Sequence, residues 1–264
     1  MYPAPVHIRA KPIVTRRCLP WPLFQRIAAP SFGKYLFAAC DVLNGWLIHN
    51  LLLNRVLPRA LSNDRRARLA TMYSALHLLN PLVFTISTRG SSEAVLSLFV
   101  LLTLHTALNG RWDAAAVLMG ASTHWKIYPL VYGVACLGAI GGVGNAKGMN
   151  DYARALVNAK TVRFAVLSAG TFVFLGLGCY AVWGYPFLYE SYLYHVHRLD
   201  HRHNFSPYFY LIYLTYGSST ENLSIWNRIL RSPLTSFGPQ MALTLGSGLL
   251  FGRAQASLSP GVRV

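Results

Sequence analysis

Long apolar stretches recur along this chain, and they constrain its fold more than any other feature. Only 12% of the residues are charged, about half the share of a typical soluble domain, and the mean hydropathy is +0.35. A helix needs about 20 mostly apolar residues to cross a membrane. Six segments approach that requirement, namely 35–54, 67–86, 92–110, 112–141, 161–183 and 236–252. The pattern predicts an all-α, polytopic membrane protein with about six or seven membrane segments.

Some of these segments are expected to be broken rather than straight. Segment 112–141 is too long for one simple crossing and contains the polar stretch THWKIYP, so it predicts two shorter helices. Asn80-Pro81 falls inside segment 67–86, and proline lacks the backbone N–H that a continuing helix needs. The carbonyls freed at such a break need partners in protein or in a wet cavity. Segment 236–252 contains five Gly or Pro residues and is the weakest candidate.

The distribution of Lys and Arg orients the segments. Five arginines lie in the loop after the first segment, Arg111 follows the third, and the loop after segment 112–141 carries Lys147, Arg154, Lys160 and Arg163. The positive-inside rule predicts that these loops are cytosolic. The opposite side then receives stretches 79–94, 122–130 and 184–235. The basic residues of the N-terminal region fall on that side too, against the rule.

Nucleic acid and a structural zinc site are both poor fits to this sequence. The net charge of +16 alone would suit a nucleic-acid-binding protein. Such a protein displays its Lys and Arg on a water-soluble scaffold, whereas here they occupy short stretches between long apolar ones. The cysteines have no zinc-ligand spacing, and three of them lie in apolar segments where inert thiols are expected: Cys40, Cys136 and Cys179.

Three polar stretches are expected to meet on the non-cytosolic side. The first carries Arg89 and Glu93, the second carries His124, Lys126 and Tyr128, and the third is LDHRHNFSPYFYLIYL at 199–214. Simpler interpretations remain open for the first two. Arg89 and Glu93 are four residues apart and would suit a surface ion pair. Lys126 could extend to the membrane interface, and the tyrosines could belong to an aromatic belt.

The third stretch predicts an anion site rather than a metal site. His201 and His203 are two residues apart, alternate with arginines that would repel a dication, and match no H-E-x-x-H template. Arginine and lysine side chains can instead donate directed hydrogen bonds to a phosphate. No metal ligands are therefore assigned. The predicted substrate-binding residues are Arg89, Glu93, His124, Lys126, Tyr128, Asp200, Arg202, His203, Asn204 and Tyr208.

Four stretches resemble, in order, the PIG-M type family of GPI mannosyltransferase I catalytic subunits: FGKYLFAACDVLNGWLI, LLNPLVFTISTRGSSEAV, THWKIYPLVY and HRHNFSPYFYLIYL. The resemblance covers roughly residues 30–245. It implies a GT-C glycosyltransferase fold in the endoplasmic reticulum membrane, with the active-site rim facing the lumen. The implied reaction moves the first mannose, α1,4-linked, from dolichyl-phosphate mannose to glucosaminyl-phosphatidylinositol. A small single-span subunit is the implied stabilising partner, no cofactor is assigned, and the involvement of a divalent metal stays open.

The resemblance also predicts how the chain is divided. Residues 1–30 form an atypical basic, proline-containing segment, 31–252 an incomplete transmembrane GT-C-like domain, and 253–264 a tail. The family's acidic D-x-D motif has no counterpart, because residues 1–30 contain no Asp or Glu. The chain is therefore expected to be truncated at both ends, and its catalytic residues are unknown.

Two alternative functions remain open at this point. One is a catalytically inactive truncated product, because the acidic motif is missing. The other is a polytopic lipid-handling or transport protein, which would place polar residues deep inside several segments. Here the polar residues concentrate at one rim, apart from Asp41, Asn44 and His49 in the first segment.

Overall fold

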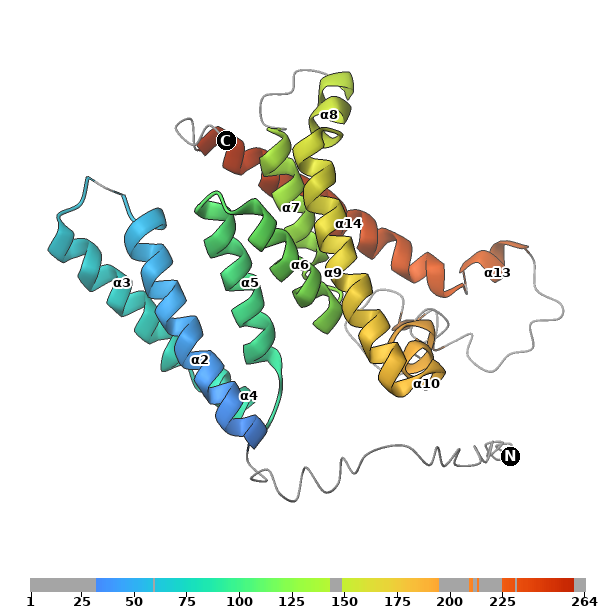
Figure 1. Cartoon of the computed structure of the whole chain (residues 1–264), viewed down its shortest axis with the longest axis horizontal. Coiled ribbons are helices and arrows are strands. Elements are labelled where there is room, and N and C mark those ends of the chain that lie inside the picture. The colour runs from blue at the N-terminus through green and yellow to red at the C-terminus, as the bar shows by residue number, and fades with distance from the viewer. Residues whose placement is uncertain are drawn as a thin grey trace.

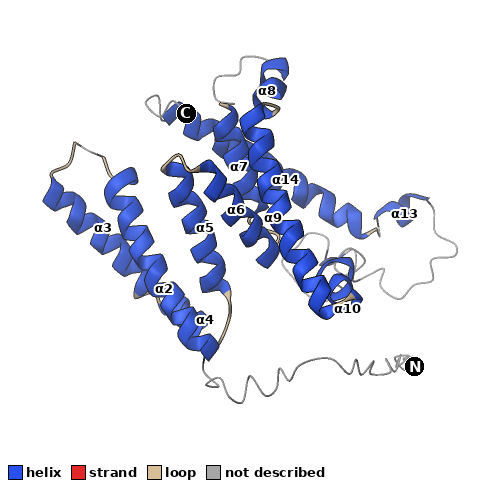
Figure 2. Cartoon of the chain, in the orientation of Figure 1, coloured by secondary structure: helices blue, strands red, loops and turns tan. Residues whose placement is uncertain are grey.

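The described part of the chain folds into helices alone. The computed structural model describes residues 32–58, 60–142, 149–194, 209, 210, 213, 225–230 and 232–258. Within these ranges every regular element is a helix and no strand is present (Figure 2). The predicted all-α fold class is confirmed.

Two helices are long and apolar enough to cross a membrane. The first is α2 (Phe32–Leu51), which continues into the π-helical turn η1 (Leu52–Val56) to make a 25-residue apolar segment. The second is α9 (Ala159–Trp183), also of 25 residues. They match the predicted segments 35–54 and 161–183. Both helices fit a membrane protein.

The predicted break at Asn80-Pro81 is present. Helix α3 (Asn63–Leu78) ends before it and α4 (Pro81–Thr88) begins at it, with a bend of 46° between the two. The Asn80 side chain caps α4 by accepting a hydrogen bond from the Leu82 backbone N–H at 3.0 Å. Pro81 occupies the first helical position, where its missing N–H costs nothing. If the bent pair counts as one span, the described residues hold up to three candidate spans.

The long segment 112–141 is divided, as predicted. It forms α6 (Trp112–Trp125) and α7 (Leu130–Gly141), and Lys126 between them is extended, with φ −150° and ψ 145°. Two of the helices in this region are apolar but shorter than a span, namely α7 and α5 (Glu93–Leu108). The weakest candidate segment lies in α14 (Pro233–Leu258), a 26-residue helix with Pro239 inside it. The shorter elements are α8 (Met149–Leu156), α10 (Tyr185–Leu188), the π-helical turn η3 (Tyr189–Leu193) and α13 (Ile225–Leu230).

Helices α2, α5, α6 and α9 lie side by side in that order, while α3 and α4 flank α2 and α14 crosses against α7 (Figure 1). The buried cluster between α6 and α9 consists of Ala115, Ala116, Met119 and Phe164. Gly120 brings the two backbones close together, since a Cβ atom added there would lie 2.3 Å from the Ser168 carbonyl oxygen. Small residues on α6 therefore set its close contact with α9.

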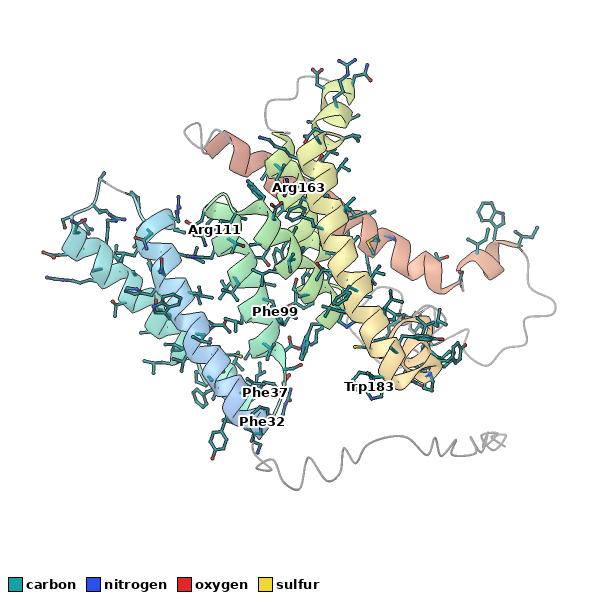
Figure 3. All side chains as sticks on the ribbon, in the orientation of Figure 1. Phe32, Phe37, Phe99, Arg111, Arg163 and Trp183 are labelled. Carbon is teal, nitrogen blue, oxygen red and sulfur yellow. The ribbon has the colours of Figure 1, made fainter. Side chains whose placement is uncertain are left out.

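The two ends of this helix bundle differ in character, and each is named here for later use. The basic end contains the turn between α5 and α6 and the start of α9, where Arg111 and Arg163 lie (Figure 3). The opposite end contains the start of α2, the start of α5, the α6–α7 break and the end of α9; Phe32, Phe37 and Trp183 mark it in Figure 3. We call it the break end. The predicted polar stretches 79–94 and 122–130 both lie there.

Candidate functional site

A lysine–glutamate ion pair joins two of the predicted polar stretches. The Lys126 ammonium group contacts the Glu93 carboxylate, although the two residues are 33 positions apart in the chain. Lys126 directly follows α6, and Glu93 is the first residue of α5. Their side chains are 40% and 41% exposed, so the pair is accessible to a ligand without being fully solvated. The structure thus pairs Glu93 with Lys126, and the alternative Arg89–Glu93 surface pair is wrong.

The first turn of α5 receives two further contacts from other helices. The Trp125 indole N–H donates to the Ser92 hydroxyl oxygen at 3.3 Å. From α2, the Asn44 side-chain amide donates to the Ala94 carbonyl oxygen at 3.0 Å. Three consecutive residues, 92–94, therefore each bind a side chain of another element. The sequence signal for this junction was only the presence of polar residues beside apolar segments.

Arg89 lies close to this junction along the chain but is not part of the ion pair. It follows the last residue of α4 and is exposed. In the described ranges its guanidinium group makes no hydrogen bond or ion pair. Gly90 follows with φ 89°, a backbone conformation that favours glycine, and it turns the chain from α4 toward α5. Arg89 is thus a cation available on the connection that leads into Glu93.

His124 occupies a different environment from Lys126, inside a group of aromatic rings. Its Nδ1 lies 3.0 Å from the Tyr192 hydroxyl, and its Nε2 lies 3.8 Å from the Cys179 sulfur. The rings of Phe172 and Phe187 pack against the imidazole, with centroids 5.7 and 6.4 Å away. His124 therefore connects the end of α6 to α9 and η3.

Tyr192 is a contact residue that the sequence did not single out. Burial raises the pKa of its hydroxyl above the usual value, and the neighbouring Cys179 adds to the shift. The phenol is therefore neutral around pH 7 and keeps its proton for hydrogen bonding with His124. The only sequence signal was the aromatic run YPFLYESYLY, which also suits a membrane-interface belt.

Of the remaining predicted substrate-binding residues, Tyr128 lies within the described ranges and the other five lie outside them. Tyr128 lies in the α6–α7 break, two residues after Lys126, and its side chain is exposed. Those outside the described residues are Asp200, Arg202, His203, Asn204 and Tyr208. The described ranges contain no group of three or more His, Cys, Asp or Glu side chains that could hold a metal ion.

The family model described as Mannosyltransferase (PIG-M) matches residues 86–258 of the chain. The chain belongs to the PIG-M mannosyltransferase family. The matched region contains both partners of the Lys126–Glu93 pair, the aromatic group around His124 and the whole third polar stretch, 199–214. The resemblance inferred from the four sequence stretches is confirmed.

Several curated proteins are similar to this PIG-M family chain. The zebrafish (Danio rerio) protein named GPI alpha-1,4-mannosyltransferase I, catalytic subunit, is 42% identical over 199 residues, which cover 73% of this chain and 48% of the relative. The GPI mannosyltransferase 1 of Gibberella zeae is 38% identical over 206 residues, 75% of this chain and 47% of the relative. That of Dictyostelium discoideum is 35% identical over 238 residues, 84% and 52% of the two chains. The chain thus spans about half the length of these relatives, and no solved structure matches it.

Two cations lie at the break end of this PIG-M family chain. Lys126 offers a charged donor that is half exposed and fixed at its base by the Trp125–Ser92 contact. Arg89 adds a second cation on the α4–α5 connection. Charge-assisted hydrogen bonds to phosphate are among the strong ones in proteins, and arginine binds phosphate in a bidentate manner. The break end thus presents two cations from different elements, of which Lys126 is paired with Glu93.

Proposed function

We propose that this chain transfers the first mannose, in α1,4 linkage, from dolichyl-phosphate mannose to glucosaminyl-phosphatidylinositol. Membership of the PIG-M family and the printed names of its relatives support this reaction. The observation that carries the site assignment is the half-exposed Lys126–Glu93 pair at the break between α6 and α7. Lys126 and Arg89 bind the phosphate of the donor in this proposal, and the substrate-binding set extends to His124 as a hydrogen-bonding neighbour and to Tyr128.

The chemistry of such a transfer requires a cation where negative charge develops. The bond between mannose C1 and the donor phosphate oxygen breaks, and its electron pair stays on the phosphate. A new bond forms between C1 and the acceptor hydroxyl oxygen, whose proton passes to a general base. A fixed lysine or arginine beside the phosphate stabilises that leaving group as the bond breaks. Lys126 supplies this charge, and the residue that acts as the base is not assigned.

Five residues of the third polar stretch, 199–214, complete the same phosphate and sugar site in this proposal. They are Asp200, Arg202, His203, Asn204 and Tyr208, which lie outside the described residues. The support for them is their place in the matched region and their chemistry, since arginine and histidine donors suit a phosphate and asparagine suits a sugar hydroxyl.

The proposed location is the membrane of the endoplasmic reticulum, with about six or seven membrane segments and the break end facing the lumen. The concentration of arginines at the opposite end supports this orientation, because positively charged loops favour the cytosolic side. A small single-span subunit is the proposed partner. The exposed apolar side chains of α9, such as Val166, Phe174 and Leu177, offer surface for lipid or for such a helix.

Mannose transfer in microsomes tests the proposal. Cells that lack GPI mannosyltransferase 1 are given this chain, and transfer from radiolabelled dolichyl-phosphate mannose to glucosaminyl-phosphatidylinositol is measured. We expect transfer by the unaltered chain and a loss of about 100-fold with Lys126→Ala, as for removal of one charge-stabilising donor. The matched control is Lys160→Ala, a lysine at the basic end, which should leave transfer unchanged.

Two results would overturn parts of this proposal separately. Absence of transfer by the unaltered, membrane-inserted chain would reject the proposed activity and favour an inactive product. Normal transfer by Lys126→Ala would reject the phosphate site while leaving the activity in place. Part-restoration by Lys126→Arg is expected, because the charge is kept while its geometry changes.

A further inference from the structure

Asn44 is a polar residue in an apolar setting that the proposed reaction does not explain. It lies at the midpoint of the 25-residue apolar segment Phe32–Val56, and its side chain is only 1% exposed. Its amide N–H donates to the Ala94 carbonyl oxygen, whereas its side-chain oxygen has no hydrogen-bond partner in the described ranges. Burying an amide whose oxygen makes no hydrogen bond is unfavourable compared with an apolar residue of similar size. Asn44 is therefore poorly explained as a residue that stabilises the fold.

The Asn44 hydrogen bond fixes the position of α5 along α2. The buried side chains of α5, which are Ala94, Leu96 and Thr103, pack by van der Waals contact, which is less directional than a hydrogen bond. A directed bond to the Ala94 carbonyl selects one register instead. Polar groups that set register at the expense of stability are known from other helical assemblies. The bond therefore determines where the first turn of α5 lies.

The first turn of α5 in turn determines where Lys126 lies. Glu93 precedes Ala94 and holds the Lys126 ammonium group, and Ser92 accepts the hydrogen bond from the Trp125 indole. Lys126 follows α6 with its backbone N–H bonded to the Ser122 carbonyl oxygen at 3.0 Å, and its side chain is held by the Glu93 carboxylate of α5. A shift of α5 by one residue would move the Glu93 carboxylate by about 1.5 Å along the helix axis and rotate it by about 100° about that axis.

We propose that Asn44 is a positioning residue that aligns Lys126 for a lipid phosphate through the first turn of α5. This inference rests on the proposed function of Lys126 and adds a buried residue of another helix that touches no substrate. Displacements of about 1 Å at a binding group are enough to reduce a reaction strongly, so a remote hydrogen bond can control it.

Binding of dolichyl phosphate tests this inference directly. The purified full chain is placed in phosphatidylcholine nanodiscs, and its affinity for dolichyl phosphate and for dolichol, which lacks the phosphate, is measured. We expect Asn44→Ala to weaken dolichyl phosphate binding about three- to tenfold, as expected for one lost hydrogen bond, and to leave dolichol binding unchanged. The control is Asn50→Ala on the same helix, which removes an exposed local hydrogen bond to Asn54 and should change neither affinity.

A double-mutant cycle separates positioning from a general loss of structure. In the Lys126→Ala background, Asn44→Ala should weaken dolichyl phosphate binding by less than about twofold, because its effect acts through Lys126. Equal losses for dolichyl phosphate and dolichol, or full additivity with Lys126→Ala, would show a structural role and overturn the inference. Should Asn44→Ala fold poorly, Asn44→Leu gives the same comparison, because leucine keeps the branched shape and the number of side-chain heavy atoms while removing the hydrogen bond.

The cycle also separates this inference from the proposed function. If Lys126→Ala binds dolichyl phosphate as well as the unaltered chain, the phosphate site itself is wrong, and the role of Asn44 fails with it. If Lys126→Ala weakens binding but Asn44→Ala does not, only the positioning role of Asn44 is rejected.

Discussion

The basic end and the break end of the bundle use their cations in different ways. At the basic end, Arg163 pairs with Asp113 at 2.7 Å, and these side chains are 69% and 59% exposed. At the break end, Lys126 pairs with Glu93 in a less exposed position, with hydrogen-bonded residues on both sides of Glu93 and with Trp125, also hydrogen-bonded, directly before Lys126. An exposed pair contributes about 0–1 kcal/mol. The comparison teaches that an exposed pair of this kind does not by itself indicate a site, whereas a cation held among contacts from several helices marks the candidate site.

A substitution at the α6–α9 contact, midway between the two ends, should reduce stability most, because both ends depend on that contact. In Gly120→Leu the new Cβ alone would lie 2.3 Å from the Ser168 carbonyl oxygen, so α6 and α9 would have to separate to admit the side chain. We expect a loss of about 3 kcal/mol or more, and the thermal unfolding of the purified protein in detergent would measure it. Gly170→Leu on α9 is the control, since nothing lies within 4 Å of its added Cβ. Equal stability of the two variants would contradict the close α6–α9 contact.

Reversing the charge of the acidic residue in each ion pair compares how much mannose transfer depends on the two ends. Glu93→Lys places two ammonium groups together at the break end, and we expect mannose transfer to fall about 10- to 100-fold. Asp113→Lys at the basic end should change transfer less than about twofold, because that pair is exposed and screened. A similar loss in both variants would remove the distinction between the ends. In the swapped variant, Glu93→Lys with Lys126→Glu, the pair is restored, but transfer should not return because residue 126 no longer carries a cation.

Removal of the Tyr192 hydroxyl tests the aromatic group at the break end. Tyr192→Phe keeps the ring contacts with Phe172 and Phe187 and removes the hydrogen bond to His124. We expect the free energy of unfolding to fall by about 1 kcal/mol. The exposed Tyr185→Phe variant should be neutral.

The same residue predicts a pH dependence with a defined sign. Because burial raises the pKa of the Tyr192 hydroxyl in the folded protein, the folded state retains the proton to higher pH than the unfolded state does. Stability from this group is thus fully present below about pH 10, the usual pKa of tyrosine, and is lost as the pH rises through the folded-state pKa. Thermal unfolding between about pH 8 and 11 should show this loss in the unaltered protein and a weaker one in Tyr192→Phe. Identical profiles would contradict it.

The smallest effect is expected at the basic end. Arg163→Ala removes one exposed ion pair, so unfolding should change by about 0–1 kcal/mol and the difference should shrink in high salt. Thermal unfolding at low and high ionic strength checks both statements. A larger, salt-independent loss would show that the basic end is as firmly organised as the break end.

Local signals in the sequence predicted the helices and their breaks well. Asn80-Pro81 combines a helix cap with a residue that cannot continue a helix, and both properties are local. The same is true of THWKIYP, where Lys126 is extended and Pro129 precedes α7. Apolar length likewise located α2 and α9, although α5 and α7 proved too short for the length criterion and the total number of spans stays a prediction.

Pairings across the bundle could not be predicted in the same way. Glu93 had Arg89 four residues away, a spacing that pairs side chains within one helix, yet Arg89 follows the end of α4 while Glu93 begins α5, and Glu93 pairs with Lys126 from the α6–α7 break. His124 was expected to face a ligand, whereas its ring contacts Tyr192 and Phe172, which come from distant positions. Asn44 carried no sign of its bond to Ala94, because register between two apolar helices is a tertiary property. The predictions at 200–208 remain predictions.

The placement of the Lys126–Glu93 pair at helix ends has a consequence for how it can open. Glu93 is the first residue of α5, where the partial positive charge of the helix dipole favours an acid. Lys126 follows the last residue of α6, where the partial negative charge of the helix dipole favours a cation. Each charge therefore keeps about 0.3–1 kcal/mol of support from its own helix when the two separate. In the proposed reaction, an incoming phosphate replaces the carboxylate at Lys126, and the α5 dipole continues to stabilise the charge of Glu93.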